Sequence, residues 1–381
     1  MIVFIIVQKL KNGGAERTAS NLSIELSRLY DVKLILFDST GITYPYGGDL
    51  ISLDCPPGKT MASKFFNIFR RVKKVKKLKK QYNPCVSISL LFNANLINVF
   101  SSSGEKTIIS IRNNLSESHL SKFDIFMERI TFKKADKIVA LSKAVELDLY
   151  NNFYKCNKYL TIYNYVDSKQ LLFSSESIDF QCEYIVSMGR LTIQKGQWHL
   201  IKAFKSFSDK HKNINLVVLG KGEMEEKLKE LIAFHHLEDR VRLCGFITNP
   251  HYIIKKAKFF VFTSLYEGLG NVLLEALSMG KLVVSTDCHD GPREILDDEV
   301  KTTSLDKPLF AKYGILFPEF ENIDDSDNFE ITQKEVELGE LMSECCNQDL
   351  IHNYSMRAYK RANDFSKDKI ISEWIKVIEE Q

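Results

Sequence analysis

Two glutamates, Glu267 and Glu275, stand eight residues apart on either side of the segment Gly268-Leu269-Gly270-Asn271. If one regular helix separated them, a rise of about 1.5 Å per residue would place them roughly 12 Å apart. Glycosidase carboxyl pairs lie about 5–9.5 Å apart, so the spacing disfavours a hydrolytic pair. Two separate contacts to one long ligand with hydroxyl and phosphate groups fit better. A solvated pair of helix-end carboxylates is the alternative.

The neighbouring residues predict the elements that position this pair. The apolar run 259–263 predicts a buried parallel strand, and residues 271–279 predict a helix ended by Gly280. Glu267 would then lie at the carboxyl end of a strand, where open α/β sheets bind ligands. The two glycines of the loop allow backbone N–H groups to approach a phosphate where the helix begins.

Two other loops carry glycines after predicted strands. Residues 13–17, Gly-Gly-Ala-Glu-Arg, open a helix and permit close approach of an anion, although a tight turn explains them equally well. Residues 189–196 contain Arg190 and Lys195, which would neutralise a diphosphate. Surface charge is the alternative for these two cations, and the phosphate-type loop at 267–271 in the same half favours the diphosphate.

Residues 64–80 contain nine basic residues, with apolar residues at helical spacing. They predict an amphipathic basic helix that lies on anionic lipid or follows a row of phosphates. An ordinary packed helix with a lysine-rich solvent face is the alternative. We expect no nucleic-acid partner, because no exposed-aromatic sheet motif or zinc knuckle accompanies the helix.

The chain as a whole predicts two α/β domains. Its 381 residues suffice for two cores, and its charge is divided: residues 1–165 carry 25 Lys and Arg against 13 Asp and Glu, and the remainder carries 27 against 36. A basic first half indicates an anionic partner such as a membrane surface or a lipid diphosphate. Alternation of strands and helices predicts two doubly wound parallel sheets. Strands are expected at 2–7, 32–37, 86–89, 107–111, 137–141, 184–189, 214–219, 241–244, 259–263 and 281–285.

The remaining segments predict a linker, an irregular region and a helical end. The linker is expected at 163–178, irregular structure at 297–335 and helices from 335 to 381. Asp325-Ser326-Asp327 falls in the acidic irregular region, and the eight cysteines lack zinc-like spacing, so we expect no metal site. Reduced thiols predict a cytoplasmic protein, and the apolar residues 1–7 are too few for a signal peptide or a membrane span.

Taken together and in this order, the motifs resemble those of retaining glycosyltransferases of family 4, which have the GT-B fold, over nearly the whole chain. The matching stretches are residues 13–17, 164–167, 189–190, 195–196, 220–222, 245–246 and 267–275. Residues 287–296 resemble the bacterial surface-polysaccharide members. The resemblance implies two Rossmann-like domains facing a central cleft. Residues 1–165 would bind the acceptor, 166–365 the nucleotide sugar, and a helix at about 366–381 would pack back on the first domain.

The resemblance also implies roles for individual residues. Glu267, Arg190 and Lys195 would be catalytic: Glu267 would hold hydroxyls of the donor sugar, and the two cations would stabilise the departing nucleoside diphosphate. Glu275 would bind the ribose. Further donor contacts are expected from Gly14, Gly189, Phe246, Gly268, Leu269, Gly270 and Asn271. Family members need no metal and retain the anomeric configuration, with the leaving phosphate accepting the acceptor's proton.

Contacts to the acceptor depend on a departure from the family pattern. Many members place a histidine of the first domain at the catalytic centre, where this chain has Arg112 and Asn113, and these residues or His119 would replace it. The expected acceptor-binding residues are Glu16, Arg17, Arg112, Asn113, Arg70, Arg71, Lys74 and Lys77. Helix 64–80 resembles family segments that bind membrane or lipid diphosphates.

The sequence therefore predicts a retaining, metal-independent hexosyltransferase. It would move a hexose or N-acetylhexosamine from a UDP-sugar to a polyprenyl-diphosphate-linked oligosaccharide of O-antigen, capsule or a related glycan. No cofactor beyond the nucleotide sugar is expected, and the protein would be cytoplasmic and peripheral on the inner face of the membrane. A GT-B sugar-nucleotide epimerase or phosphorylase, and a non-catalytic basic scaffold that binds membrane or RNA, are the alternatives.

Overall fold

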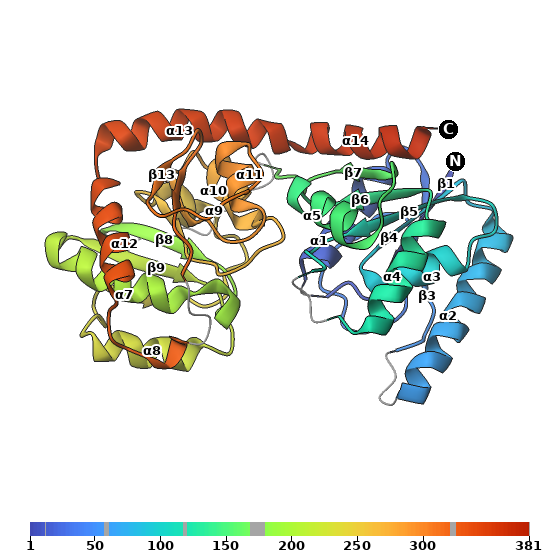
Figure 1. Ribbon diagram of the computed structural model, residues 1–381, viewed down its shortest axis with the longest axis horizontal. Helices are drawn as coiled ribbons and strands as arrows, with labels where there is room; N and C mark the ends of the chain where they lie inside the picture. Colours follow the sequence, from blue (N-terminus) through green and yellow to red (C-terminus); the bar gives the residue numbers. More distant parts are fainter. Residues whose placement is uncertain (12, 57–60, 117–119, 168–179, 321–324, 381) are drawn as a thin grey trace. The chain divides into compact units, whose positions relative to one another are not determined.

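The structure is a computed structural model that describes residues 1–11, 13–56, 61–116, 120–167, 180–320 and 325–380, with only the backbone described at 61–65. The chain divides into two compact units (Figure 1). The first comprises Met1–Asn164 together with Ile370–Gln381, and the second comprises Tyr165–Lys369.

The first unit is built on a seven-stranded sheet in the order β3-β2-β1-β4-β5-β6-β7, in which all neighbouring strands are parallel. Its strands are β1 Ile2–Val7, β2 Asp31–Leu36, β3 Asp49–Ser52, β4 Val86–Leu90, β5 Lys106–Ile111, β6 Lys137–Ala140 and β7 Tyr159–Thr161. Its helices are α1 Gly14–Leu26, α2 Met61–Tyr82, α3 Phe92–Phe100, α4 Lys122–Lys134 and α5 Lys143–Asp148, followed by a π-helical turn at Leu149–Phe153. Helix α3 packs against α2 on one side and α4 on the other (Figure 1).

The second unit has a seven-stranded sheet in the order β10-β9-β8-β11-β12-β14-β13. Its strands are β8 Glu183–Met188, β9 Ile214–Leu219, β10 Val241–Leu243, β11 Phe260–Phe262, β12 Val283–Thr286, β13 Leu309–Phe310 and β14 Ile315–Phe317. Its helices are α7 Gln197–Lys210, α8 Glu225–Phe234, α9 His251–Lys256, α10 Asn271–Ser278, α11 Pro292–Asp297, α12 Gln333–Glu344 and α13 Gln348–Ala362, with 3₁₀ turns at Ile193–Lys195, Asp325–Asp327 and Asn363–Phe365. Only the pairing of β13 with β14 is antiparallel among the described strands.

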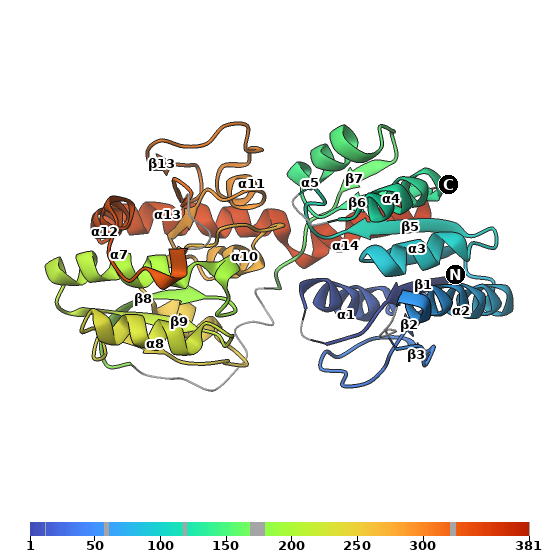
Figure 2. The same cartoon turned by 60° about the horizontal axis from the view of Figure 1, so that its bottom comes forward.

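The helices after the second sheet are joined to it by specific contacts. Helix α12 begins with a capping box in which the Thr332 backbone N–H donates to Glu335 Oε2 at 2.7 Å. Glu335 is buried and also lies 2.8 Å from His199 Nδ1, so the cap fastens α12 to α7, and both views show these helices side by side (Figures 1 and 2). Helix α13 packs on α10, where the Tyr359 hydroxyl donates to the Met279 carbonyl at 3.4 Å.

The last helix, α14 (Lys367–Glu379), begins in the second unit, and its residues from Ile370 onward belong to the first. Its apolar face, which includes Trp374, is buried. Lys106 Nζ donates to the Val377 carbonyl at 2.7 Å, and the Tyr30 hydroxyl donates to Glu379 at 2.7 Å. The end of the chain is therefore part of the core of the first unit.

The fold class expected from the sequence is confirmed, with differences at short elements. Strands β3 and β7 and helices α3 and α11 were not expected, and β13 and β14 lie within the segment 297–335 that was expected to be irregular. These strands have two to four residues, which is too short for a periodic pattern to emerge. Most of the expected linker, residues 168–178, lies outside the described part of the chain.

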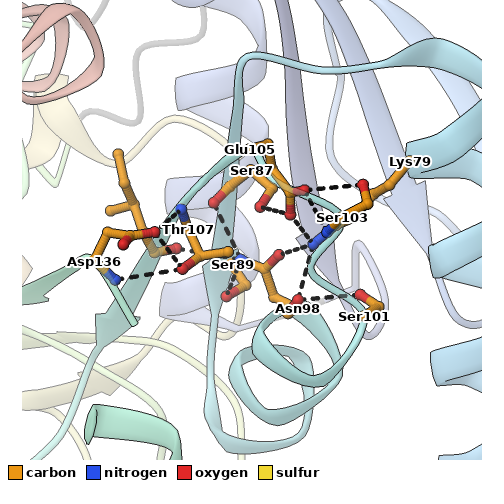
Figure 3. Close-up of polar contacts among 10 residues, drawn as sticks. Lys79, Ser87, Ser89, Asn98, Ser101, Ser103, Glu105, Thr107 and Asp136 are labelled. Atoms are coloured by element: carbon orange, nitrogen blue, oxygen red, sulfur yellow. Dashed lines mark hydrogen bonds and ion pairs between the residues drawn. The ribbon is translucent and has the colours of Figure 1, made fainter. Parts of the chain in front are cut away.

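A buried polar cluster joins α2 to the sheet of the first unit (Figure 3). Lys79 Nζ lies 2.5 Å from Glu105 Oε1 and donates to Asn98 Oδ1 at 2.7 Å, and all three residues are buried. Ser87 Oγ donates to Glu105 Oε1 at 3.2 Å. Lys79 is thus a member of the basic helix that lies in the protein core, with both a counter-charge and hydrogen bonds.

A second buried ionisable residue, Glu128 on α4, has a different environment. Its side chain is 1% exposed, and neither carboxylate oxygen has a hydrogen-bond donor among the described residues. Desolvation by burial, with a smaller contribution from Asp124, raises the pKa of Glu128 from its ordinary 4.5 to about 8. Glu128 is therefore protonated in the folded protein at neutral pH.

Candidate functional site

A buried ion pair lies where two neighbouring strands of the second unit end. Lys195, in the loop after β8, pairs through Nζ with Glu267 Oε1, in the loop after β11. Ser264 Oγ donates to the same Glu267 oxygen at 2.7 Å. The Lys195 and Glu267 side chains are 14% and 9% exposed, so their charges are only weakly screened by water. The sequence-predicted catalytic lysine and carboxylate are therefore adjacent.

Backbone contacts fix these two loops against each other. The Leu265 N–H donates to the Gln194 carbonyl at 2.8 Å, and Gln194 Nε2 donates to the Tyr266 carbonyl at 2.9 Å. Gly196 has a φ of 57°, and a Cβ atom there would lie 2.3 Å from the Thr263 carbonyl oxygen. Any larger residue at position 196 would push the loops apart, so the ion pair depends on this glycine.

Arg190 lies in the same loop with a fixed backbone and an exposed side chain. Its carbonyl accepts from Gln197 Nε2 at 2.9 Å and from the Thr192 N–H at 2.9 Å. Within the described parts of the chain, no carboxylate pairs with the Arg190 guanidinium. This cation is therefore presented to solvent beside Gly189, as a diphosphate contact requires.

The segment between the two glutamates forms the beginning of α10. Gly270 precedes the helix with a φ of 87°, and Leu269 is 2% exposed, so Leu269 can offer a ligand only its backbone. Gly268 and Asn271 are half-buried. Glu275 is 7% exposed in the body of α10, and its Oε2 lies 3.2 Å from His251 Nε2. Only Glu275 belongs to the helix, because Glu267 lies in the loop before it.

Phe246 is an aromatic ring that the protein leaves uncovered. Its side chain is 73% exposed in the loop between β10 and α9. The preceding residue, Gly245, has a φ of 70° and accepts a hydrogen bond from the Gly220 N–H at 2.8 Å. A fixed backbone with a free aromatic face suits a planar base.

In the first unit, two expected acceptor residues, Glu16 and Arg17, lie at the start of α1, as does Gly14, which was expected to contact the donor. Glu16 is half-buried, whereas Gly14, Arg17 and Asn113 are exposed. Arg112 is 8% exposed, and its Nη2 donates to Thr18 Oγ1 at 3.3 Å and to Asn164 Oδ1. His119 lies outside the described residues.

The environment of Arg112 favours an anionic ligand. Among the described residues, the hydrogen-bond acceptors around its guanidinium are the neutral side chains of Ser110, Thr18 and Asn164. Desolvation by burial lowers the pKa of Arg112 to about 9. An anion beside this guanidinium would supply the charge compensation that its neutral partners do not.

Helix α2 places its cations on two opposite sides. Arg71 donates through Nε to the Cys55 carbonyl at 3.0 Å, and Lys74 Nζ donates to the Leu53 carbonyl. These two residues therefore hold the helix in place: Arg71 is buried and Lys74 is half-buried, and their contacts to an acceptor stay predictions. The side chains of Arg70 and Lys77 are exposed and are therefore accessible to a phosphate group.

Two neighbours of the glutamates were not expected to belong to the site. Ser264 contacts Glu267, and His251 contacts Glu275 from 24 residues away in the sequence. No local spacing signals the contact of His251, because α9 and α10 are separated by a strand. Among the described residues, no group of three His, Cys, Asp or Glu is arranged to hold a metal ion.

Comparison with solved structures defines the fold. A glycosyltransferase from Rickettsia africae superposes with a TM-score of 0.78 at 17% identity, covering 100% of this chain and 98% of its own. HepE from Anabaena, solved in complex with UDP, superposes with a TM-score of 0.77 at 17% identity over 100% of both chains. The two sheets with their helices therefore form a GT-B fold.

Sequence comparison gives the family. The model described as "Glycosyl transferases group 1" matches residues 168–312. An uncharacterised glycosyltransferase of Methanocaldococcus jannaschii is 34% identical over 380 residues, covering 92% of this chain and 93% of its own length. The Campylobacter jejuni N-acetylgalactosamine-N,N'-diacetylbacillosaminyl-diphospho-undecaprenol 4-alpha-N-acetylgalactosaminyltransferase is 32% identical over 307 residues, covering 77% and 83%. The chain belongs to the group 1 glycosyltransferases, which confirms the predicted activity class; family 4 and the retaining mechanism stay predictions.

Proposed function

We propose that this protein is a retaining glycosyltransferase that needs no metal. It transfers a hexose or N-acetylhexosamine from a UDP-sugar to a polyprenyl-diphosphate-linked oligosaccharide in the synthesis of O-antigen, capsule or a related glycan. The Lys195–Glu267 pair at the ends of β8 and β11 is the observation that carries this proposal. The names of similar proteins support the acceptor class, since the Campylobacter relative acts on an undecaprenol diphosphate.

The proposed reaction exchanges one bond of the anomeric carbon for another on the same face of the sugar. The bond to the diphosphate oxygen breaks, the acceptor hydroxyl oxygen bonds to the same carbon, and its proton passes to the leaving phosphate. Lys195 and Arg190 stabilise the negative charge that grows on the diphosphate. Glu267 receives hydroxyls of the donor sugar, and its contacts to Lys195 and Ser264 hold the carboxylate in place.

The other residues bind the two substrates. Glu275 binds the ribose hydroxyls, and the ring of Phe246 and its backbone meet the nucleobase. In the first unit, Arg112 and Asn113 at the end of β5 contact the acceptor. Arg112 does so as a buried cation with neutral partners. Arg17 and Glu16 at the start of α1 contact the acceptor as well.

We also propose that α2 holds the protein on the inner face of the cytoplasmic membrane. Phe66 and Phe69 are 67% and 58% exposed at its beginning, and the exposed cations follow on the same face at helical spacing. The helix contains no acidic residue. Helix α4 also exposes two phenylalanines, Phe123 and Phe126, at 53% and 58%. The phenylalanines would enter the apolar layer of an anionic bilayer, and the cations that follow them would contact its headgroups.

Binding to anionic vesicles should depend on the exposed cations of α2. In the variant R70Q/K73Q/K77Q, affinity for phosphatidylglycerol-containing vesicles is expected to fall roughly 100-fold, since each cation near such a surface contributes about 1 kcal/mol. Co-flotation with vesicles at two salt concentrations measures this. A control variant, K210Q/K212Q/K360Q, removes three exposed lysines of the second unit and should bind normally. Equal losses in both variants would contradict a specific role for α2.

A nucleotide panel tests the donor class. Addition of UDP should raise the unfolding temperature of the second unit more than GDP or ADP does, because ligands stabilise the state that binds them. Transfer of sugar to a polyprenyl-diphosphate acceptor, with release of UDP, is the expected reaction. Release of a sugar phosphate that requires inorganic phosphate would instead indicate a phosphorylase. Vesicle or RNA binding without any nucleotide effect would indicate a scaffold.

A further inference from the structure

His251 begins α9 and touches the carboxylate proposed to hold the ribose. Its Nε2 lies 3.2 Å from Glu275 Oε2, and the two side chains are 7% and 9% exposed. We propose that His251 is a positioning residue for nucleotide binding, which orients the Glu275 carboxylate toward the two ribose hydroxyls. This proposal rests on the ribose-binding role of Glu275 given above.

The contacts on the other side of the ring determine where its protons lie. His251 Nδ1 is 2.5 Å from Asn249 Oδ1, and the backbone N–H of His251 donates to the same oxygen at 3.4 Å. Because a backbone N–H can only donate, this atom of Asn249 is the carbonyl oxygen of the amide. The Nδ1 atom therefore donates to Asn249. On the opposite side of the ring, Nε2 faces Glu275 Oε2, so the two ring nitrogens contact two different residues.

The contact from His251 is directional, because it joins ring atom Nε2 to one defined oxygen of the Glu275 carboxylate. Asn249 fixes the ring, the ring fixes Oε2, and rotation of the Glu275 carboxylate is thereby restricted. Two adjacent ribose hydroxyls require a carboxylate in one orientation, and a site that is prepared in advance loses less entropy on binding.

The location of the pair links two parts of the proposed nucleotide site. Phe246 lies in the loop between β10 and α9, and His251, five residues later, is the first residue of α9. Glu275 belongs to α10, which packs against α9. Residues 246–251 would thus contact the base directly through Phe246 and the ribose indirectly through His251. A purely structural ion pair would stabilise the fold equally well, but it would not respond to the hydroxyls of the ligand.

Binding of UDP and of 2′,3′-dideoxy-UDP, measured by calorimetry, separates these roles. The wild-type protein should prefer UDP. In H251N, whose shorter side chain cannot reach Glu275, UDP affinity should fall roughly 10-fold while affinity for the dideoxy analogue changes little. H251Q places an amide nitrogen near the position of Nε2 and should restore most of the preference. In transfer assays, H251N should raise KM for the donor and leave kcat nearly unchanged.

A control and a reference variant make each outcome decisive. H235A removes another buried histidine of the second unit, whose Nε2 contacts the Phe329 carbonyl at 2.9 Å, and should leave the preference for UDP intact. If H251N weakens both ligands equally, the positioning role is wrong. If E275Q abolishes the preference and H251N does not, only the role of His251 fails. If E275Q keeps the preference, Glu275 does not bind ribose, and the proposed donor site itself is overturned.

Discussion

K195A should lower kcat for sugar transfer about 1,000-fold, and E267A should lower it to a similar extent. Removal of one preorganised group that stabilises developing charge costs roughly 100- to 1,000-fold in enzymes of several classes. Lys195 is expected at the upper end, because its ammonium is only 14% exposed and acts with little screening by water. Steady-state release of UDP in the presence of acceptor measures the effect.

Loss of the ion pair must be separated from loss of catalysis, because each single variant leaves a charge without its partner. The double variant K195A/E267A removes both charges. It should fold as well as the single variants or better and stay inactive, if both residues contact the substrate. Recovery of turnover in the double variant would show that the pair is only structural. K205A, which removes a surface lysine of α7 that pairs with Asp209, is the control and should transfer sugar normally.

E128Q should stabilise the first unit at pH 8 by on the order of 4 kcal/mol and by much less near pH 5. The pKa of Glu128 is about 8 in the folded protein and near its ordinary 4.5 in the unfolded chain. Between these values the folded state binds more protons than the unfolded state, so the wild-type protein loses stability as the pH rises from 4.5 to 8. Above pH 8 the loss levels off. Glutamine stays neutral throughout and does not contribute this loss.

Urea unfolding at several pH values measures the difference, followed by a signal from the first unit. E230Q, a change at an exposed glutamate of α8, is the matched control and should show no such pH-dependent gain. A constant difference between E128Q and wild type across the whole range would contradict the raised pKa. Such a result would mean that the Glu128 carboxylate finds a partner in solution.

The sequence predicts elements better than it predicts partners. Apolar runs locate β8 and β11, whose following loops contain Lys195 and Glu267, since burial on both sheet faces leaves a strong local pattern. Strand β11 separates His251 from Glu275 in the sequence, so only the packing of α9 against α10 brings the two side chains together. The local sequence also does not predict that the side chain of Arg71 is buried against the Cys55 carbonyl. A long cationic side chain can bury its stem and still reach a backbone carbonyl.

The buried Lys79–Glu105 pair sets the angle of α2 about its own axis. Apolar side chains on the inner face of a helix can replace one another with a moderate loss of folding free energy. The buried ammonium of Lys79, in contrast, needs the Glu105 carboxylate as its counter-charge. A slip of one residue would rotate the helix by about 100° and leave both charges buried and apart. Residues on the outer face of α2 can therefore be substituted while the same face of the helix stays turned to solvent. If α2 contacts lipid as proposed, preference for different headgroups could evolve on this face without any change in the fold.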